Sequence, residues 1–249
     1  MDIEHSIAKT RQEFEKSFQE AQYYNKQTAD DKHLKLLLDL VSPLENDTIL
    51  DLGTGNGYIA FPLALYNPHC LIVGMDIVVH ALEANTNKAK EYGINNLKFI
   101  SYDGKSYPFK DNSIDIIVTR YALHHFPNLE NSFHEMCRVL KKGGKLIISD
   151  PTPNKNDISG FVDEFMQKKP DGHIKFYSFA EMDEMLIKAA FKFEFQKNTT
   201  IKFPRKNPKE YEQLLLKYDK DIWEGYEIEI VNNEIWIKET VLNIVYRKC

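Results

Sequence analysis

Apolar residues recur with two different periods along the chain, and the changes of period predict the secondary structure. Between residues 46 and 150, short runs of β-forming apolar residues alternate about five times with segments whose apolar residues recur every three or four positions. This alternation is typical of an α/β fold with a parallel sheet covered by helices on both faces. We expect strands over 49–52, 71–76, 97–101, 114–119 and 145–149, and helices that end near Tyr66 and span about 79–92 and 129–140.

Two local signals refine these elements. Pro62 lies inside the helix that ends near Tyr66 and predicts a kink or a late start there. Ser178 and Glu181 form a capping box, which begins a helix. Before residue 46 we expect two or more helices between Ile7 and Val41 with a polar link at 25–31. After residue 150 we expect an excursion from the sheet at 151–177, a helix from 179 to about 190, a strand at 191–201 and a helix at 208–223. The chain should end with a hairpin of 226–230 and 234–237 and a last strand at 241–247.

The first predicted strand stops at three glycines spaced two apart, Gly53, Gly55 and Gly57. Glycines let the backbone adopt positive φ and let a ligand approach where a Cβ would otherwise stand. The N–H groups of the helix that follows can face a polar or anionic ligand. Ligands of parallel sheets sit at the carboxyl ends of the strands, and polar residues stand at five such predicted ends: Asp51, Asp76, Asp103, Arg120 and Asp150.

Composition and charge narrow the class of protein. A chain of 249 residues with 43% hydrophobic and 28% charged residues is typical of one large or two small soluble domains. Its net charge of -5 argues against a nucleic-acid partner, although a local basic patch stays open. We expect no membrane span, no signal peptide and a cytoplasmic location. No His, Cys and carboxylate cluster has metal-ligand spacing, so we expect no metal.

The spacing around the glycine turn distinguishes two classes of ligand. The dinucleotide fingerprint requires glycine or alanine at position 58, where this chain has Tyr58. The pattern Asp51-x-Gly53-x-Gly55-x-Gly57 instead resembles the class I S-adenosylmethionine-dependent methyltransferases. Asp76, 19 residues after Gly57, matches that family's ribose-binding acid, because a carboxylate there can accept from both ribose hydroxyls.

The resemblance continues beyond the turn. The segment 102–109 looks like the family's acid-then-Pro-Phe segment, in which the acid, here Asp103, accepts from the adenine amino group, and 109–115 and 138–144 resemble the segments before strands four and five. The ubiquinone and menaquinone biosynthesis C-methyltransferases are the most similar subgroup. The resemblance implies a Rossmann-like, doubly wound, seven-stranded sheet with an antiparallel last strand and helical lid elements.

We expect a single methyltransferase domain over 1–249. It divides into an N-terminal helical lid at 1–45, a cofactor-binding core at 46–150, lid insertions at 151–177 and 204–224, and the C-terminal part of the sheet at 178–203 and 225–249. The lid carries the aromatic residues Phe18, Tyr23, Tyr24, Phe161, Phe165, Tyr177 and Trp223, which suggests an acceptor with apolar or aromatic surface. Simple packing of the lid onto the sheet is the alternative explanation of these residues.

The resemblance implies S-adenosylmethionine as methyl donor, S-adenosylhomocysteine as product and a small molecule as acceptor. The implied cofactor-binding residues are Asp51, Gly53, Thr54, Gly55, Asn56, Gly57, Asp76, Ile77, Tyr102, Asp103, Gly104 and Arg120. Arg120 either meets the cofactor carboxylate or pairs with an acid such as Asp51 or Asp76, and the structural pairing is preferred. Transfer from a sulfonium is an in-line displacement, so proximity and orientation are the main catalytic effects.

His124 and His125 are the candidate catalytic residues, because they follow the fourth strand and a neutral imidazole can accept a proton from the acceptor. His124 is preferred on position alone. A structural role for both histidines stays open, in which one packs under the sheet edge and the other bonds to the backbone. The methylated atom, the need for a base and the oligomeric state are not determined by the sequence.

Three other functions remain as alternatives. A nicotinamide dehydrogenase is disfavoured by Tyr58, and NAD binding without S-adenosylmethionine binding would favour it. A nucleic-acid methyltransferase is disfavoured by the negative charge and by residues 120–123, which lack the Asn/Asp-Pro-Pro-aromatic motif of nucleic-acid amino methyltransferases. A non-catalytic cofactor-binding module would bind the donor and transfer no methyl group.

Overall fold

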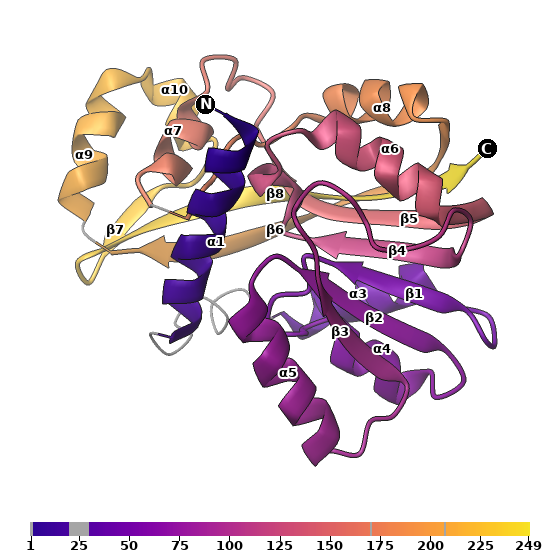
Figure 1. Ribbon diagram of the computed structural model, residues 1–249. Coiled ribbons are helices and arrows are strands. Elements are labelled where there is room, and N and C mark those ends of the chain that lie inside the picture. The colour runs from indigo at the N-terminus through magenta and orange to yellow at the C-terminus, as the bar shows by residue number, and fades with distance from the viewer. Residues whose placement is uncertain (1, 20–29, 170, 207) are drawn as a thin grey trace.

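A computed structural model describes residues 2–19, 30–169, 171–206 and 208–249. Its centre is an eight-stranded sheet with the order β3-β2-β1-β4-β5-β8-β6, and β7 pairs with β8 beside this path (Figure 1). The strands are β1 (Thr48–Leu52), β2 (Leu71–Asp76), β3 (Leu97–Ser101), β4 (Ile114–Arg120), β5 (Leu140–Thr152), β6 (Phe191–Arg205), β7 (Glu229–Val231) and β8 (Glu234–Lys248).

The sheet is parallel from β3 to β5, and β8 is inserted antiparallel between β5 and β6. The strand order reverses between β1 and β4, which are neighbours in the sheet although two strands separate them in sequence. The carboxyl ends of β1 and β4 therefore form the topological switch point, where open α/β sheets bind ligands. The predicted doubly wound fold with an antiparallel last strand is confirmed, and the predicted strand number of seven was one too low because β7 forms an eighth.

The helices lie in two layers on either side of the sheet (Figure 1). Apolar residues of α3 and α4 pack with one face of β1, β2 and β4, and those of α6 and α8 pack with the opposite face. Both faces of these strands are covered, which explains why their sequences are almost continuously apolar. These helices are α3 (Asp31–Val41), α4 (Ala60–Tyr66), α6 (Leu129–Val139) and α8 (Phe179–Lys188), and α5 (Val79–Glu91) follows β2.

A third apolar cluster joins α7 and α9 to one end of β6 and β8, with Phe161, Phe165, Tyr211 and Tyr226 among its buried residues. Figure 1 shows α7, α9 and α10 gathered at this end, while α1 crosses in front of the sheet. The remaining helices are α1 (Ile3–Gln19), α7 (Phe161–Gln167), α9 (Pro208–Lys217), α10 (Lys220–Glu224) and the short 3-10 turn η1 (Leu123–His125).

Several element boundaries were predicted correctly from local signals. Pro62 is the third residue of α4, so it marks a late helix start, since proline needs no intrahelical partner in the first turn. The capping box of Ser178 and Glu181 is present at the start of α8. Asn232 and Asn233 have φ of 50 and 62 and turn the chain between β7 and β8, as the hairpin prediction required.

Several predicted elements were wrong in extent. The strands predicted at 234–237 and 241–247 are one continuous strand, β8, whose polar residues at 238–240 had suggested a break. The helix predicted at 208–223 is divided at residues 218–219 into α9 and α10. Strands β5 and β6 extend beyond their predictions, because pairing with the long β8 supplies backbone partners to residues whose side chains gave no strand signal.

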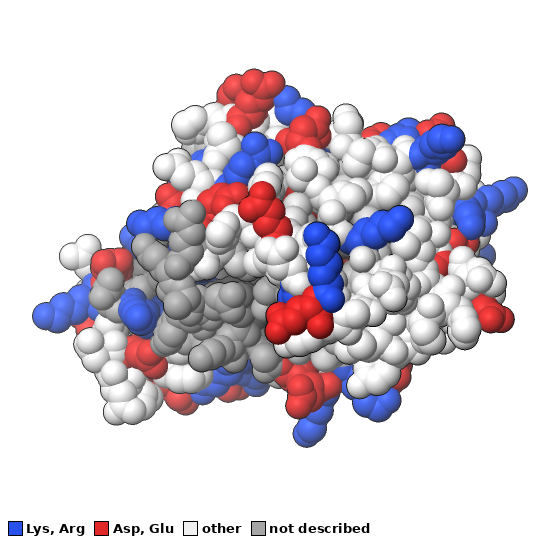
Figure 2. Space-filling view, turned by 60° about the horizontal axis from the view of Figure 1, so that its bottom comes forward, with Lys and Arg blue, Asp and Glu red and all other residues white. Residues whose placement is uncertain are grey.

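Charged side chains of both signs are mixed on the surface. In the face shown in Figure 2, Lys and Arg side chains are interspersed with Asp and Glu around the rim rather than gathered in one basic patch among the described residues. Of the helices that the structure describes, none combines the length and the apolar character that crossing a bilayer requires.

Candidate functional site

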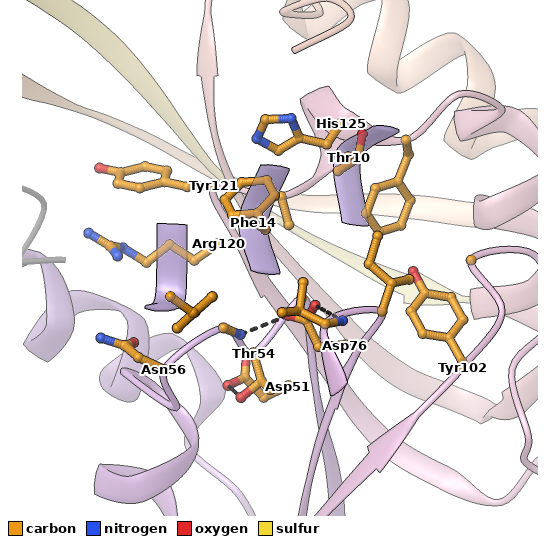
Figure 3. Close-up of a pocket in the computed structure, with 18 of the residues that line it drawn as sticks. Thr10, Phe14, Asp51, Thr54, Asn56, Asp76, Tyr102, Arg120, Tyr121 and His125 are labelled. Carbon is orange, nitrogen blue, oxygen red and sulfur yellow. Dashed lines mark hydrogen bonds between the residues drawn. The ribbon is translucent and has the colours of Figure 1, made fainter. Parts of the chain in front are cut away.

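A large pocket lies above the carboxyl ends of β1, β2 and β4, at the switch point of the sheet. It encloses about 1230 Å³ including the space at its mouth. Figure 3 shows Asp51, Thr54 and Asp76 on its floor, Arg120 and Tyr121 on one side, Tyr102 on the other, and Thr10 and Phe14 of α1 above. A pocket of this size and position suits a small organic ligand of nucleotide dimensions.

The glycine turn after β1 forms part of this floor. Gly53 and Thr54 donate their backbone N–H groups to the Met75 carbonyl oxygen at 2.8 and 3.1 Å, which holds the turn against β2. Gly53 and Gly55 line the pocket with φ of 71 and 49. Positive φ favours glycine, so the sequence could place this turn correctly.

Gly57, the third glycine of the turn, packs against α4. Its φ is 76, and a Cβ on it would come within 2.6 Å of the Phe61 ring. Phe61 is buried in α4. Gly57 is absent from the residues that line the pocket, so this glycine lets α4 pack closely rather than letting a ligand approach.

Asp76 ends β2 at the pocket wall and is 8% exposed. Its Oδ2 accepts the Gly55 N–H at 2.8 Å, and its Oδ1 accepts the Val78 N–H at 3.0 Å. Burial raises the pKa of this carboxyl, while the backbone donors oppose that shift. Each oxygen has a further lone pair, so the side chain is fixed in place and can still accept bonds from a ligand.

Asp51 lies deeper in the floor and is 2% exposed. Its Oδ2 accepts the Thr54 hydroxyl at 2.7 Å. Burial raises the pKa of Asp51 to about 7, and the nearby Asp76 raises it further, whereas Thr54 and Arg120 lower it. Two buried acids close together favour a ligand that brings hydrogen-bond donors or positive charge.

Arg120 and Tyr121 form one side of the pocket at the end of β4. The Arg120 guanidinium lies 4.4 Å from the centre of the Tyr58 ring and 4.0 Å from that of Tyr121. Tyr121 has a φ of 52, a left-handed conformation that a bulky side chain rarely adopts. Its backbone N–H donates to the Ser149 carbonyl oxygen at 2.9 Å, which holds this conformation and turns the ring toward the pocket.

Helix α1 covers the pocket from above, and its contacts come from distant parts of the chain. The Phe14 ring meets the His125 ring edge to face, with centroids 5.1 Å apart. Lys105 pairs with Glu4 at 2.7 Å. A Cβ on Gly172 would overlap the Thr10 hydroxyl, so the loop before α8 touches α1 directly. Ile7, Thr10, Phe14, Ser17 and Phe18 contribute to the pocket lining.

The two histidines of η1 face different spaces. His125 lines the main pocket, whereas His124 is 6% exposed and lines a smaller cavity behind it. His124 Nδ1 lies 3.0 and 3.1 Å from the two Asp150 oxygens. Burial lowers the pKa of both imidazoles to about 3, so both are neutral near pH 7. The ring centroids are 4.2 Å apart.

A family model described as a methyltransferase domain matches residues 43–216, which include the whole pocket floor. The chain belongs to this methyltransferase domain family. The family membership predicted from the residues at 51–57, 76 and 102–109 is therefore confirmed.

Individual relatives of this methyltransferase domain agree with the family match. The chain is 30% identical over 158 residues to the uncharacterized methyltransferase YcgJ of Bacillus subtilis, covering 63% of this chain and 62% of that protein. It is 31% identical over 140 residues to the demethylmenaquinone methyltransferase of Thermotoga maritima, covering 56% of this chain and 59% of that protein. The match thus spans about six tenths of these relatives' length.

The fold is shared with solved structures of low sequence identity. The crystal structure of YcgJ from Bacillus subtilis aligns with a TM-score of 0.76 at 23% identity, covering 88% of this chain and 99% of that chain. At this identity the likeness concerns the fold, and it includes the doubly wound sheet predicted from the sequence.

Most of the predicted site residues of this methyltransferase domain meet in one pocket. The pocket is lined by Asp51, Gly53, Thr54, Gly55, Asn56, Asp76, Ile77, Tyr102, Gly104, Arg120 and His125. Gly57, Asp103 and His124 are outside it. Asp103 is exposed, and its Oδ1 accepts the backbone N–H groups of Lys105 and Ser106, each at 2.8 Å.

Other lining residues were missed by the sequence argument. Tyr58, Tyr121 and Phe126 flank predicted motifs, but nothing in their spacing indicated that they face the ligand space. The α1 residues carried an apolar stripe that predicted a helix and gave no sign of where it docks. Of the predicted lid aromatics, Phe18 lines the pocket, Phe161 and Phe165 belong to the third cluster, and Tyr23 and Tyr24 lie outside the described residues.

Proposed function

We propose that the protein binds S-adenosylmethionine in the main pocket and transfers its methyl group to a small-molecule acceptor in the cytoplasm. The observation that carries this proposal is the buried Asp76 carboxyl at the end of β2, held by the N–H groups of Gly55 and Val78. The family match supports it, as does the name of the demethylmenaquinone methyltransferase relative.

The residues of the pocket fit this donor. The free lone pairs of Asp76 suit two ribose hydroxyls, and Gly53 and Gly55 leave open space beside the turn. Ile77 and Tyr102 provide apolar walls next to Asp76, where an adenine ring would lie. The predicted adenine contact of Asp103 is not part of the proposal, because that side chain is exposed and holds its own loop.

When bound, the donor supplies an activated methyl group on a sulfonium. The protein itself has to orient the acceptor behind that methyl group and keep water out, which converts the encounter into an effectively unimolecular step. Helix α1 serves this purpose, because Phe14 and Phe18 place aromatic surface directly over the pocket. An acceptor with apolar or aromatic surface would match these walls.

His124 is the better candidate for a base where the acceptor has to lose a proton. Its Nδ1 lies 3.1 and 3.0 Å from the two Asp150 oxygens, and the tautomer with its proton on Nδ1 leaves the lone pair of Nε2 to accept a proton. Burial lowers the pKa of this imidazole to about 3, so it is a weak base in this position. This histidine lines the smaller cavity behind the main pocket. An acidic partner that fixes the tautomer is the arrangement that general-base histidines use.

Calorimetric titration of S-adenosylmethionine tests the proposal. Wild type is expected to bind the donor, and Asp76→Ala is expected to weaken binding about a hundredfold, since two hydrogen bonds to a charged group are lost at roughly 1.5 kcal/mol each. Asp103→Ala is the matched control and should change the affinity less than threefold. Unchanged affinity in folded Asp76→Ala, or binding of NAD with no binding of S-adenosylmethionine, would overturn the proposal.

A further inference from the structure

One Lys or Arg side chain lines the main pocket among the residues that the structure describes, that of Arg120. Its guanidinium lies between two tyrosine rings, 4.4 Å from the centre of Tyr58 and 4.0 Å from that of Tyr121. Figure 3 shows Arg120 and Tyr121 on the same side of the pocket. Stacking on both faces restricts the plane of a guanidinium, so the two rings decide where its N–H donors point.

The start of α3 holds the hydroxyl groups of both rings. The Tyr58 hydroxyl donates to the Asp30 carbonyl oxygen at 2.9 Å and accepts the Asp30 N–H at the same distance. The Tyr121 hydroxyl lies 3.4 Å from His33 Nδ1, and the centroids of these two rings are 5.7 Å apart. Asp30 and His33 are the N-cap and the third residue of α3, so the first turn of this helix secures both sides of the Arg120 stack.

The buried amide of Asn243 fixes the protonation of His33. Asn243 Nδ2 donates to the Lys197 carbonyl oxygen and to the Thr199 hydroxyl oxygen, each at 3.0 Å. This orients the amide so that Oδ1, which can only accept, lies 2.9 Å from His33 Nε2. The tautomer with its proton on Nε2 satisfies this contact and leaves the Nδ1 lone pair to accept the Tyr121 hydroxyl. Burial lowers the pKa of His33, so the imidazole keeps this neutral form near pH 7.

Tyr121 needs this support because its backbone is strained. Its φ of 52 lies in the left-handed region that bulky side chains rarely adopt. Such a conformation persists only where the surrounding structure holds it, and it is common at functional sites. The Tyr121 N–H donates to the Ser149 carbonyl oxygen at 2.9 Å, and Ser149 Oγ lies 3.0 Å from His33 Nε2. The backbone and the hydroxyl of Tyr121 are therefore held by one connected group of buried residues.

The Arg120 guanidinium lies near an acid of the pocket floor. Burial raises the pKa of Asp51 and Arg120 lowers it, so the two groups are close enough to interact. A ligand that carries both an ammonium and a carboxylate group matches this pair, and S-adenosylmethionine carries both at its amino-acid end. A guanidinium binds a carboxylate most strongly through two parallel N–H bonds, which require its plane to be fixed.

We propose that His33 is a positioning residue of the donor site: through Tyr121 it fixes the Arg120 guanidinium in the plane that binds the donor carboxylate. The inference rests on the proposed function, because it assigns the carboxylate to S-adenosylmethionine. Without the bond to His33 the Tyr121 ring can turn, and the guanidinium loses one of its two stacking partners. Its paired bonds to the carboxylate then weaken, whereas the ligand contacts at Asp76 do not depend on the stack.

Titration calorimetry with S-adenosylmethionine and with its decarboxylated analogue tests the inference on the full chain. Wild type should bind S-adenosylmethionine at least about tenfold more tightly than the analogue, which lacks the carboxylate. His33→Gln keeps a donor near the Nε2 position for Asn243 and removes the acceptor that faces Tyr121. It should weaken S-adenosylmethionine binding at least about fivefold and change the affinity of the analogue less than about twofold. His134→Gln, at an exposed position of α6, is the matched control and should leave both affinities unchanged.

Tyr121→Phe separates positioning from stability, because it removes the hydroxyl and keeps the ring. It should reproduce the selective loss of S-adenosylmethionine affinity, and adding His33→Gln to it should cause no further selective loss, since both changes remove the same bond. His33→Asn, which keeps an acceptor near the Nδ1 position, should retain more of this affinity than His33→Gln.

The outcomes separate this inference from the proposed function. Equal weakening of both ligands by His33→Gln and Tyr121→Phe, or unchanged S-adenosylmethionine affinity in both variants, would overturn the inference. Equal affinities of wild type for S-adenosylmethionine and the analogue would overturn it as well, because the carboxylate would then have no partner in the site. A wild type that binds neither ligand refutes the proposed function.

Discussion

Burial raises the pKa of three acidic side chains at or near the two cavities. It raises the pKa of Asp51 and Asp150 to about 7 and that of Glu239 to about 8. These carboxyl groups therefore titrate near neutral pH rather than near pH 4. Side chains with shifted pKa values are common at functional sites, because a charged group that is to meet a ligand is often buried before the ligand binds.

The stability of Glu239→Gln relative to wild type should depend on pH. The folded pKa of Glu239 is about 8 and its ordinary value is 4.5, so between these values the folded chain holds a proton that the unfolded chain has released. Wild type therefore loses stability as pH rises through this window, by at most about 1.4 kcal/mol per pH unit, and the Gln variant does not.

Urea denaturation at pH 5 and pH 8 measures this effect. The free energy of unfolding of Glu239→Gln minus that of wild type should be larger at pH 8 than at pH 5, by at least about 1 kcal/mol. Glu229→Gln, whose side chain is 57% exposed, should show a constant difference. A constant difference for Glu239→Gln as well would show that this carboxyl is not buried as described.

Single residues differ in how well the sequence predicted them. Asp76 could be predicted because it ends a short apolar strand at a fixed distance from the glycine turn. Glu239 could not, because the polar residues around it suggested a break between two strands. In the continuous β8, Ile235, Ile237 and Glu239 share one face, so period two alone places the carboxyl inside.

At the scale of elements, α1 covers the main pocket. It rests on the loop before α8, where Gly172 has a φ of 80. A Cβ on Gly172 would lie 3.0 Å from the Thr10 Cα, so the absence of a side chain leaves room for the helix. Gly104 similarly approaches Ile7, where a Cβ would lie 3.0 Å from the side chain. The close fit of two glycines against one helix indicates a defined docked position.

Gly172→Ala should displace α1, and Gly160→Ala is its matched control. Both glycines have positive φ, 80 and 78, so alanine strains the backbone equally at each site. Only at Gly172 does the new Cβ also overlap α1, because nothing lies within 4 Å of a Cβ on Gly160. Gly172→Ala should lose about 1 to 3 kcal/mol more stability than Gly160→Ala and bind S-adenosylmethionine more weakly.

Denaturant unfolding, calorimetry and hydrogen exchange measure this difference. We expect faster amide exchange in α1 for Gly172→Ala alone, with α4 and α6 as internal references. Equal stability losses and equal donor affinities in the two variants would mean that α1 does not need its contact with Gly172 to cover the pocket.

Helix α3 shows why docking of elements is harder to predict than their existence. Its helical spacing was clear from the sequence, and it begins with Asp30 capping the N–H groups of Lys32 and His33. Its anchor, however, is the buried His33 Nε2, which lies 3.0 Å from Ser149 Oγ and 2.9 Å from Asn243 Oδ1. These residues are 116 and 210 positions away, so no local pattern could have linked them.

At the scale of the whole molecule, the two cavities lie where three packed regions meet. Two apolar clusters cover the faces of the sheet, and the third joins α7 and α9 to the ends of β6 and β8. The sequence predicted the sheet, its helices and most of the residues that line the main pocket, because these depend on local periodicity and turns. It did not predict the smaller cavity, because that cavity is built by the long β6 and β8 and by loops whose positions depend on distant contacts.

Methyl transfer itself is the central claim, and labelled product is its most direct measure. A metabolite extract is incubated with the protein and S-adenosylmethionine carrying an isotope-labelled methyl group, and mass spectrometry searches for labelled small molecules. We predict a labelled product with wild type and a strongly reduced amount with Asp76→Ala. No labelled product from wild type that binds the donor, or equal labelling with Asp76→Ala, would contradict the account.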